Sequence, residues 1–163
     1  MGKSYMALLD DVAKAIDKLP AKVATAAVNF SKSRFVKQNW HDQSPEPWEK
    51  RRRDRRGGKK RQKGAVLVDS GRLKRSIRIV SISRERVVTG TDVPYARIHN
   101  DGLDGAVQVR KHNRRSRKGN VYGVKAHTRK VKMPRRRFLG DSAELARQLE
   151  NLMADEIKNA IEN

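Results

Sequence analysis

The sequence predicts an α+β fold with N-terminal helices, a small antiparallel β-sheet with basic loops, and a C-terminal amphipathic helix. Two observations support this prediction. Apolar residues recur at helical spacing at both ends of the chain, whereas the middle alternates short apolar stretches with Gly, Asn and Asp turn signals. The length of 163 residues allows one core of modest size, so we expect a single domain over residues 1–163.

The beginning of the chain predicts helix. Residues 3–18 and 21–37 each carry apolar side chains at helical spacing, and Pro20 separates them. Because proline lacks an amide hydrogen, Pro20 should end the first helix, kink it or begin the next one. A helical hairpin and one kinked helix both fit. The first apolar stripe is wide and contains Met6, Leu9, Ala13 and Ile16, with Leu8, Val12 and Leu19 beside them.

Aromatic and apolar residues then indicate extended structure. Trp40 and Trp48 should pin an ordered, proline-containing loop. Residues 76–82 and 86–91 predict a β-hairpin, because Ile and Val recur in both stretches and a tight turn at Arg84-Glu85 separates them. The apolar stretch 95–99 fits no single element type.

Two further strands are expected at residues 106–110 and 120–126, with a long basic loop, 111–119, between them. Residues 141–161 give the clearest helix prediction, and Asp141 with Glu144 has the spacing of a capping box at its start. Residues 141–163 carry six carboxylates against two cations, whereas the centre of the chain is basic. The acidic face of this helix is either a simple solvated surface or one half of a contact between copies.

The chain is strongly basic. It has 39 Lys and Arg against 18 Asp and Glu, for a formal net charge of +21. Such an excess is typical of proteins that meet a polyanion or an acidic partner. Residues 49–64 contain no apolar side chain, so burial cannot order them, and we predict a mobile basic arm there.

The cations of the arm and of the basic loop are candidates for contact with phosphates or with an acidic protein, although they would also serve solubility alone. The sequence lacks the patterns of helix-turn-helix, zinc-finger and aromatic RNA-recognition modules, so sequence-specific readout is not indicated. The candidate residues are Arg51, Arg52, Arg53, Arg55, Arg56, Lys59, Lys60, Arg61, Arg114, Arg115 and Arg117.

Catalytic chemistry is not indicated. The absence of cysteine removes disulfides and thiolate metal sites. The four histidines lack the helical i, i+4 spacing of a zinc protease. His99-Asn100 and His112-Asn113 are only weakly similar to the motif of a His-Asn-His nuclease. No apolar run approaches the ~20 residues needed to cross a bilayer. We therefore expect no enzyme activity, catalytic residue, metal or cofactor, and no membrane contact.

Three sequence blocks are the most specific feature. They are Asp69-Ser-Gly-Arg-Leu-Lys-Arg-Ser-Ile77, Gly90-Thr-Asp-Val-Pro-Tyr-Ala-Arg-Ile-His-Asn100 and Pro134-Arg-Arg-Arg-Phe-Leu-Gly-Asp-Ser142. In this order and spacing they resemble the phage virion morphogenesis (tail completion) family. The third block departs from the family's usual pattern: this chain has Pro134-Arg-Arg-Arg-Phe138 where the family more often has a small residue and a second proline.

The resemblance implies a structural protein that helps to join a phage head to its tail. It would form a hexameric or dodecameric ring in the neck of the virion, after assembly in the host bacterial cytoplasm. Its partners would be connector or head-closure proteins and tail tube proteins, with weak non-specific contact with genomic DNA. Candidate assembly residues are Arg72, Leu73, Tyr95, Arg97, His99, Arg135, Arg136, Phe138 and Leu139.

The alternative is a non-specific nucleic-acid-binding protein that uses its basic arms. It predicts tight polyanion binding that collapses between about 50 and 200 mM salt. The assembly hypothesis instead predicts weak binding to polyanions and self-association of the protein.

Overall fold

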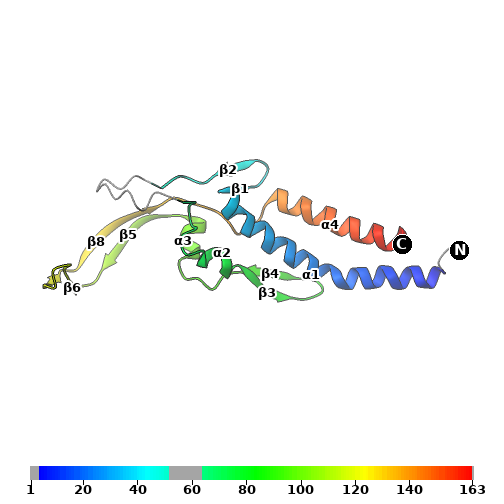
Figure 1. The fold of residues 1–163 in the computed structure, drawn as a ribbon, viewed down its shortest axis with the longest axis horizontal. Coiled ribbons are helices and arrows are strands. Elements are labelled where there is room, and N and C mark those ends of the chain that lie inside the picture. Colours follow the sequence, from blue (N-terminus) through cyan, green and yellow to red (C-terminus); the bar gives the residue numbers. More distant parts are fainter. Residues whose placement is uncertain (1–3, 52–63, 163) are drawn as a thin grey trace.

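The protein is an elongated α+β molecule in which two long helices lie side by side and a β-hairpin projects from the opposite end (Figure 1). The computed structural model describes residues 4–51 and 64–162. α1 (Tyr5–Lys37) packs along α4 (Ala143–Glu162), and the strands form antiparallel two-stranded ladders. The predicted class is confirmed, although the strands of the described residues do not join into one sheet.

α1 is a single helix that continues through Pro20, so the helical hairpin left open by the sequence is not formed. It ends at Gln38, which has a left-handed backbone conformation with φ 54°. The Gln38 side-chain amide donates to the carbonyl of Phe35 at 2.7 Å and to that of Val66 at 3.0 Å, and it accepts from the Val66 N–H. This one side chain fastens the end of α1 to the segment that precedes the first sequence block.

The start of α4 corrects the predicted capping box. The N-cap is Ser142, whose hydroxyl accepts from the Leu145 N–H at 3.1 Å and donates to the His41 carbonyl at 2.6 Å. Asp141 therefore lies one residue before the cap, and Glu144 does not complete the box. Ser142 takes this position because its short hydroxyl can cap the helix and hold the neighbouring strand together.

The tryptophan-containing stretch forms a small hairpin of β1 (Asn39–His41) and β2 (Pro45–Pro47). Trp40 and Trp48 are both buried, as a loop pinned by two indoles requires. The Trp48 Nε1–H donates to the carbonyl of Arg137 at 2.9 Å, which connects this hairpin to the third sequence block.

The first block forms α2 (Arg72–Ser76), and the predicted hairpin follows as β3 (Arg78–Ile82) and β4 (Val87–Gly90). This hairpin lies against α1 (Figure 1). The apolar stretch of uncertain type is a short helix, α3 (Ala96–Asp101). Gly102 ends it with φ 79°, and a Cβ there would lie 3.1 Å from the backbone nitrogen of Arg135, so only glycine fits this turn.

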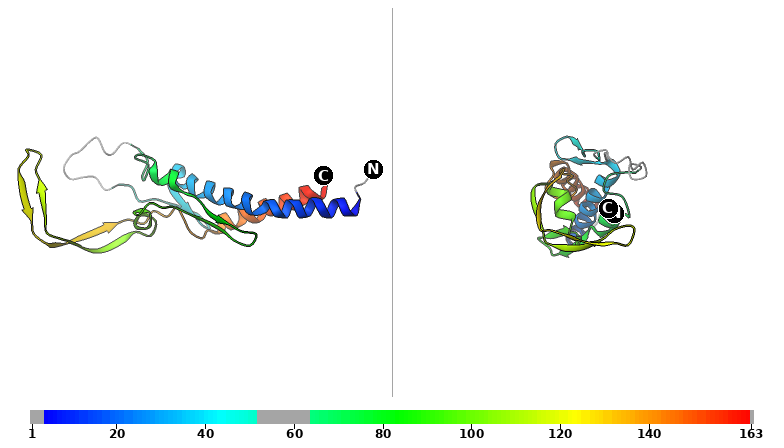
Figure 2. Two further views of the ribbon diagram at one scale, coloured as in Figure 1. Left: turned by 90° about the horizontal axis from the view of Figure 1, so that it is seen from below. Right: turned by 90° about the vertical axis from the view of Figure 1, so that its left-hand side faces the viewer.

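A long hairpin follows α3. β5 (Leu103–Val109) pairs with β8 (His127–Met133), and farther out β6 (His112–Arg115) pairs with β7 (Val121–Val124). Figure 2 shows that the outer part turns away from the direction of β5 and β8.

The prediction for this region is wrong in its details. Residues 106–109 pair with 127–130 instead of bordering a loop with 120–126, and half of the expected loop 111–119 is strand. The turn itself spans Ser116–Asn120, where the Ser116 N–H donates to the Asn120 carbonyl at 2.7 Å. β7 lies within the predicted strand 120–126, whereas β6 and β8 were not predicted. Every residue of β6 is exposed, so this strand carries no apolar alternation.

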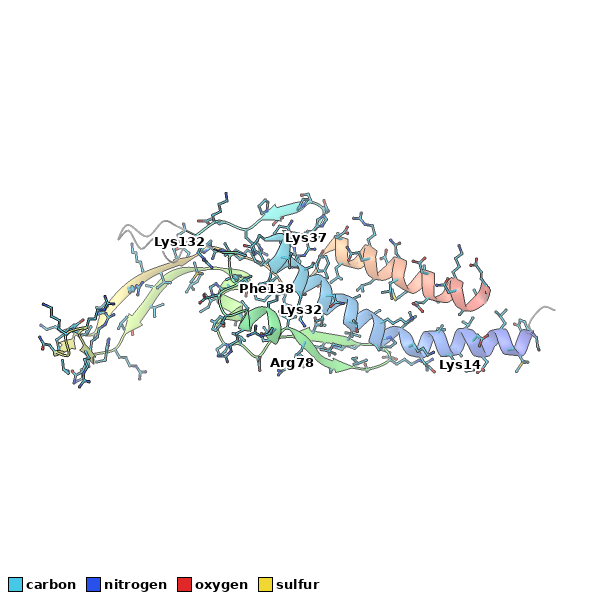
Figure 3. All side chains as sticks on the ribbon, viewed as in Figure 1. Lys14, Lys32, Lys37, Arg78, Lys132 and Phe138 are labelled. Atoms are coloured by element: carbon cyan, nitrogen blue, oxygen red, sulfur yellow. The ribbon has the colours of Figure 1, made fainter. Side chains whose placement is uncertain are left out.

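The core lies where the C-terminal half of α1 meets α2, α3 and the segment before α4; Figure 3 shows Phe138 there. The Phe35 ring centroid is 5.0 Å from that of Phe138 and 5.4 Å from that of Trp48. Phe138 and Ile77 are both fully buried. The cluster consists of Val28, Phe35, Trp48, Leu73, Ile77, Val93, Ala96 and Phe138.

Phe138→Ala should lower the free energy of unfolding by about 3 to 5 kcal/mol, because it removes a buried ring and leaves a cavity. Val36→Ala is the control, since Val36 is 71% exposed and its loss should cost less than about 0.5 kcal/mol. Urea unfolding followed by circular dichroism measures both. Similar losses in the two variants would contradict the placement of the core.

Candidate assembly interface

The second and third sequence blocks are tied together by a side-chain amide. The Asn100 Oδ1 accepts hydrogen bonds from the backbone N–H groups of Phe138 and Leu139, both at 2.9 Å. Beside them, the Arg136 N–H donates to the His99 carbonyl at 2.8 Å. These bonds satisfy backbone groups of a segment that has no regular secondary structure of its own.

The first block joins the same junction. Its Leu73 and Ile77 are buried in the core. The hydroxyls of Ser76 and Thr91 share a hydrogen bond of 2.6 Å, and Thr91 Oγ1 also accepts from the Val93 N–H at 3.2 Å. All three blocks therefore meet at one place, where they hold the fold together.

Arg136 is a second tie within the third block. Its Nε and Nη2 atoms donate to the Glu49 carbonyl at 3.0 and 2.9 Å. Desolvation by burial lowers the pKa of the guanidinium from its ordinary value, and the nearby Glu49 carboxylate opposes that shift. The side chain thus serves as a structural donor inside the chain.

The nine predicted assembly residues lie in three environments. Those buried inside the chain are Leu73, Arg136 and Phe138. Those half-buried are His99 and Leu139. Those exposed at the surface are Arg72, Tyr95, Arg97 and Arg135.

The structure brings five of these residues together at α3. Arg97, Phe138 and Leu139 line a shallow pocket of about 310 Å³. Next to it, the Tyr95 and His99 rings meet edge to face with centroids 5.9 Å apart. The pocket presents apolar walls and the ion pair of Arg97 with Asp101, which suits recognition of a neighbouring side chain.

A second surface was not predicted as an interface. On α1, Leu8 and Val12 are half-buried, but Met6, Leu9 and Ile16 are 72%, 47% and 37% exposed. We call these three residues the open stripe. The width of the apolar stripe in the sequence is the signal that would have revealed it, because a single neighbouring helix covers only part of so wide a face.

The predicted phosphate-contact residues are only partly described. Arg114 and Arg115 on β6, and Arg117 in the tip turn, are all exposed. Arg51 donates to the Ala65 carbonyl at 3.0 Å. Residues 52–63 of the predicted mobile arm lie outside the described residues. The predicted contact residues in that range are Arg52, Arg53, Arg55, Arg56, Lys59, Lys60 and Arg61.

Within the described ranges, no group of three or more His, Asp or Glu side chains is arranged to hold a metal ion. The helices of the same ranges are each too short or too polar to cross a bilayer.

The profile of the phage virion morphogenesis family matches residues 4–158, which is most of the chain. The chain belongs to the phage virion morphogenesis family. No match was found among curated proteins or solved structures. Membership associates this virion morphogenesis protein with the other proteins of a phage particle, and the junction described above shows how its sequence blocks build the fold.

Burial at the junction affects the protonation of His99 in the virion morphogenesis protein. Desolvation by burial, followed by the positive charge of Arg136, lowers its pKa from the ordinary value of 6.5. Its Nδ1 atom is buried and has no hydrogen-bond partner among the described residues. The junction therefore favours the neutral imidazole.

Stability should fall as the pH drops below about 6.5, the pKa of an unfolded-state histidine. Between that pH and the lowered folded-state pKa, the unfolded chain binds more protons, so stability rises with pH. Unfolding free energies measured at several pH values should show this slope in the wild type and a flatter one in His99→Gln. His112→Gln is the control and should keep the slope. An unchanged slope in His99→Gln would contradict this assignment.

Proposed function

We propose that this virion morphogenesis protein is a non-catalytic structural subunit that completes the phage tail and joins it to the DNA-filled head. It acts in a hexameric or dodecameric ring, between connector or head-closure proteins and tail tube proteins. The observation that supports this proposal is the open stripe on α1, which the chain itself leaves uncovered.

A closed ring needs two different surfaces on each subunit, one for each neighbour. The open stripe and the α3 pocket are two such surfaces, and they lie apart along the molecule (Figure 1). The stripe is apolar, and its burial against a second copy would remove Met6, Leu9 and Ile16 from water. Each copy could thus contact neighbours on two sides.

The acidic charge of α4 is less available for such a contact than its sequence suggests. Glu156 forms an ion pair with Lys22 of α1, and Glu144 and Glu162 form ion pairs within α4 itself. Hydrogen bonds from Gln148 and Arg147 also lower the pKa of the Glu144 carboxyl. Apolar contact is therefore the main attraction that we propose between copies.

Electron microscopy of lysates tests the role directly. A parent phage with an early stop codon in this gene should give DNA-filled heads beside separate tails, because the two cannot join. Wild-type protein supplied from a plasmid should restore joined virions. Normal joined virions without the protein would refute tail completion.

The open stripe is tested in the same complementation assay. Leu9→Glu with Ile16→Glu should fail to restore joined virions, because it places two carboxylates in the proposed contact. Lys14→Gln with Lys18→Gln is the matched control: it changes the charge of the same part of α1 by the same amount and should restore assembly. Circular dichroism should show that both variants fold. Full rescue by the stripe variant would remove the stripe from the interface.

A further inference from the structure

The hairpin after α3 is one continuous arm. The pairs of the inner ladder run from Leu103↔Met133 to Val109↔His127, and those of the outer ladder from His112↔Val124 to Arg115↔Val121. The same offset relates the partners in both ladders, so the register continues through the interruption between them. We call residues 103–133 the hairpin arm.

The hairpin arm carries a concentrated positive charge. It contains ten Lys and Arg side chains and a single acid, Asp104. Asp104 pairs with Lys132, and this is the ion pair that the described structure gives to the arm. In Figure 3 the side chains at the arm's far end spread into solvent.

The bend between the two ladders forms an open groove of about 710 Å³, whose lining includes Lys111, His112, Gly123 and Lys125. On each side of the bend, an imidazole contacts a carbonyl two residues earlier in the chain: the His112 Nδ1 lies 2.9 Å from the Arg110 carbonyl, and the His127 Nδ1 lies 2.9 Å from the Lys125 carbonyl. The bend is therefore built by matching contacts on both strands.

Lys111 and Lys125 line this bend from its two sides. Extended through the interruption, the offset of both ladders sets Lys111 opposite Lys125. Like charges in directly opposite positions destabilise a hairpin. In addition, an isolated two-stranded ribbon is only marginally stable in water. An anion in the groove would relieve the repulsion and give the ribbon a partner.

We propose that the hairpin arm binds the phosphate backbone of duplex DNA without sequence specificity, with Lys111 and Lys125 in the groove and Arg114 and Arg117 toward the tip. Duplex DNA carries one negative charge per about 1.7 Å of its axis, which matches a dense row of unpaired cations. The arm offers no acceptor pattern or aromatic row for reading bases. This proposal does not depend on the ring.

A second copy of the chain is a less suitable occupant. The arm is strongly basic, so contact with a second copy would need an acidic surface on that copy. The acidic helix α4 already uses Glu144, Glu156 and Glu162 in ion pairs of its own chain. Duplex DNA itself supplies the negative charge through its phosphates.

The test is fluorescence anisotropy of a short, labelled, mixed-sequence DNA duplex with the purified full chain, across about 50 to 200 mM salt. The test variant combines Lys111→Gln, Arg114→Gln, Arg117→Gln and Lys125→Gln. It should lose at least tenfold in affinity at the lowest salt. The slope of log K against log salt should fall by about 3 to 4, since each lost phosphate contact removes about 0.9.

The matched control combines Lys14→Gln, Lys18→Gln, Lys37→Gln and Lys158→Gln, which remove the same charge from α1 and α4. It should change the salt slope by less than about 1. Equal losses in the two variants would show that only net charge matters and would overturn the proposal. Poly-glutamate is the second probe: binding as tight as that of DNA would overturn it in favour of an acidic protein partner.

Discussion

The burial of Phe138 is the interaction on which the rest of the structure depends. Its ring packs against Phe35 of α1, and its backbone N–H donates to the side chain of Asn100. Those two contacts join the first helix, the second sequence block and the segment that leads into α4. Because this segment has no regular secondary structure, its backbone relies on Asn100 and its neighbours for hydrogen bonds. The three blocks are thus explained as one junction.

The core is concentrated at one junction, so the two ends of the molecule contribute little to it. The two long helices extend to one side and the hairpin arm to the other (Figure 2). No residue of α4 is fully buried, and every residue of β6 is exposed. An isolated two-stranded hairpin such as the outer part of the arm is only marginally stable in water.

The sequence predicted the elements that have strong periodicity. The helices at both ends and the hairpin of β3 and β4 were found because apolar residues repeat at the spacing of those elements. In the hairpin arm, strands were predicted at β5 and β7, but β6, β8 and the pairing were missed because these exposed strands give little apolar alternation. Ser142 was missed as the N-cap because its role depends on the His41 carbonyl, a contact distant in sequence. The three sequence blocks of the candidate site could be recognised from the sequence. Only the tertiary structure shows that Leu73 is buried whereas Arg72 is exposed.

Native-state hydrogen exchange tests the central claim that one junction holds an otherwise open molecule together. The amides of Phe138 and Leu139 should exchange only through global unfolding, because both donate to a half-buried Asn100 inside the junction. The amides of β6 and β7 should exchange much faster, through local opening of the outer hairpin. Fast exchange at Phe138 and Leu139, or equal protection of the outer hairpin in the free protein, would contradict the account.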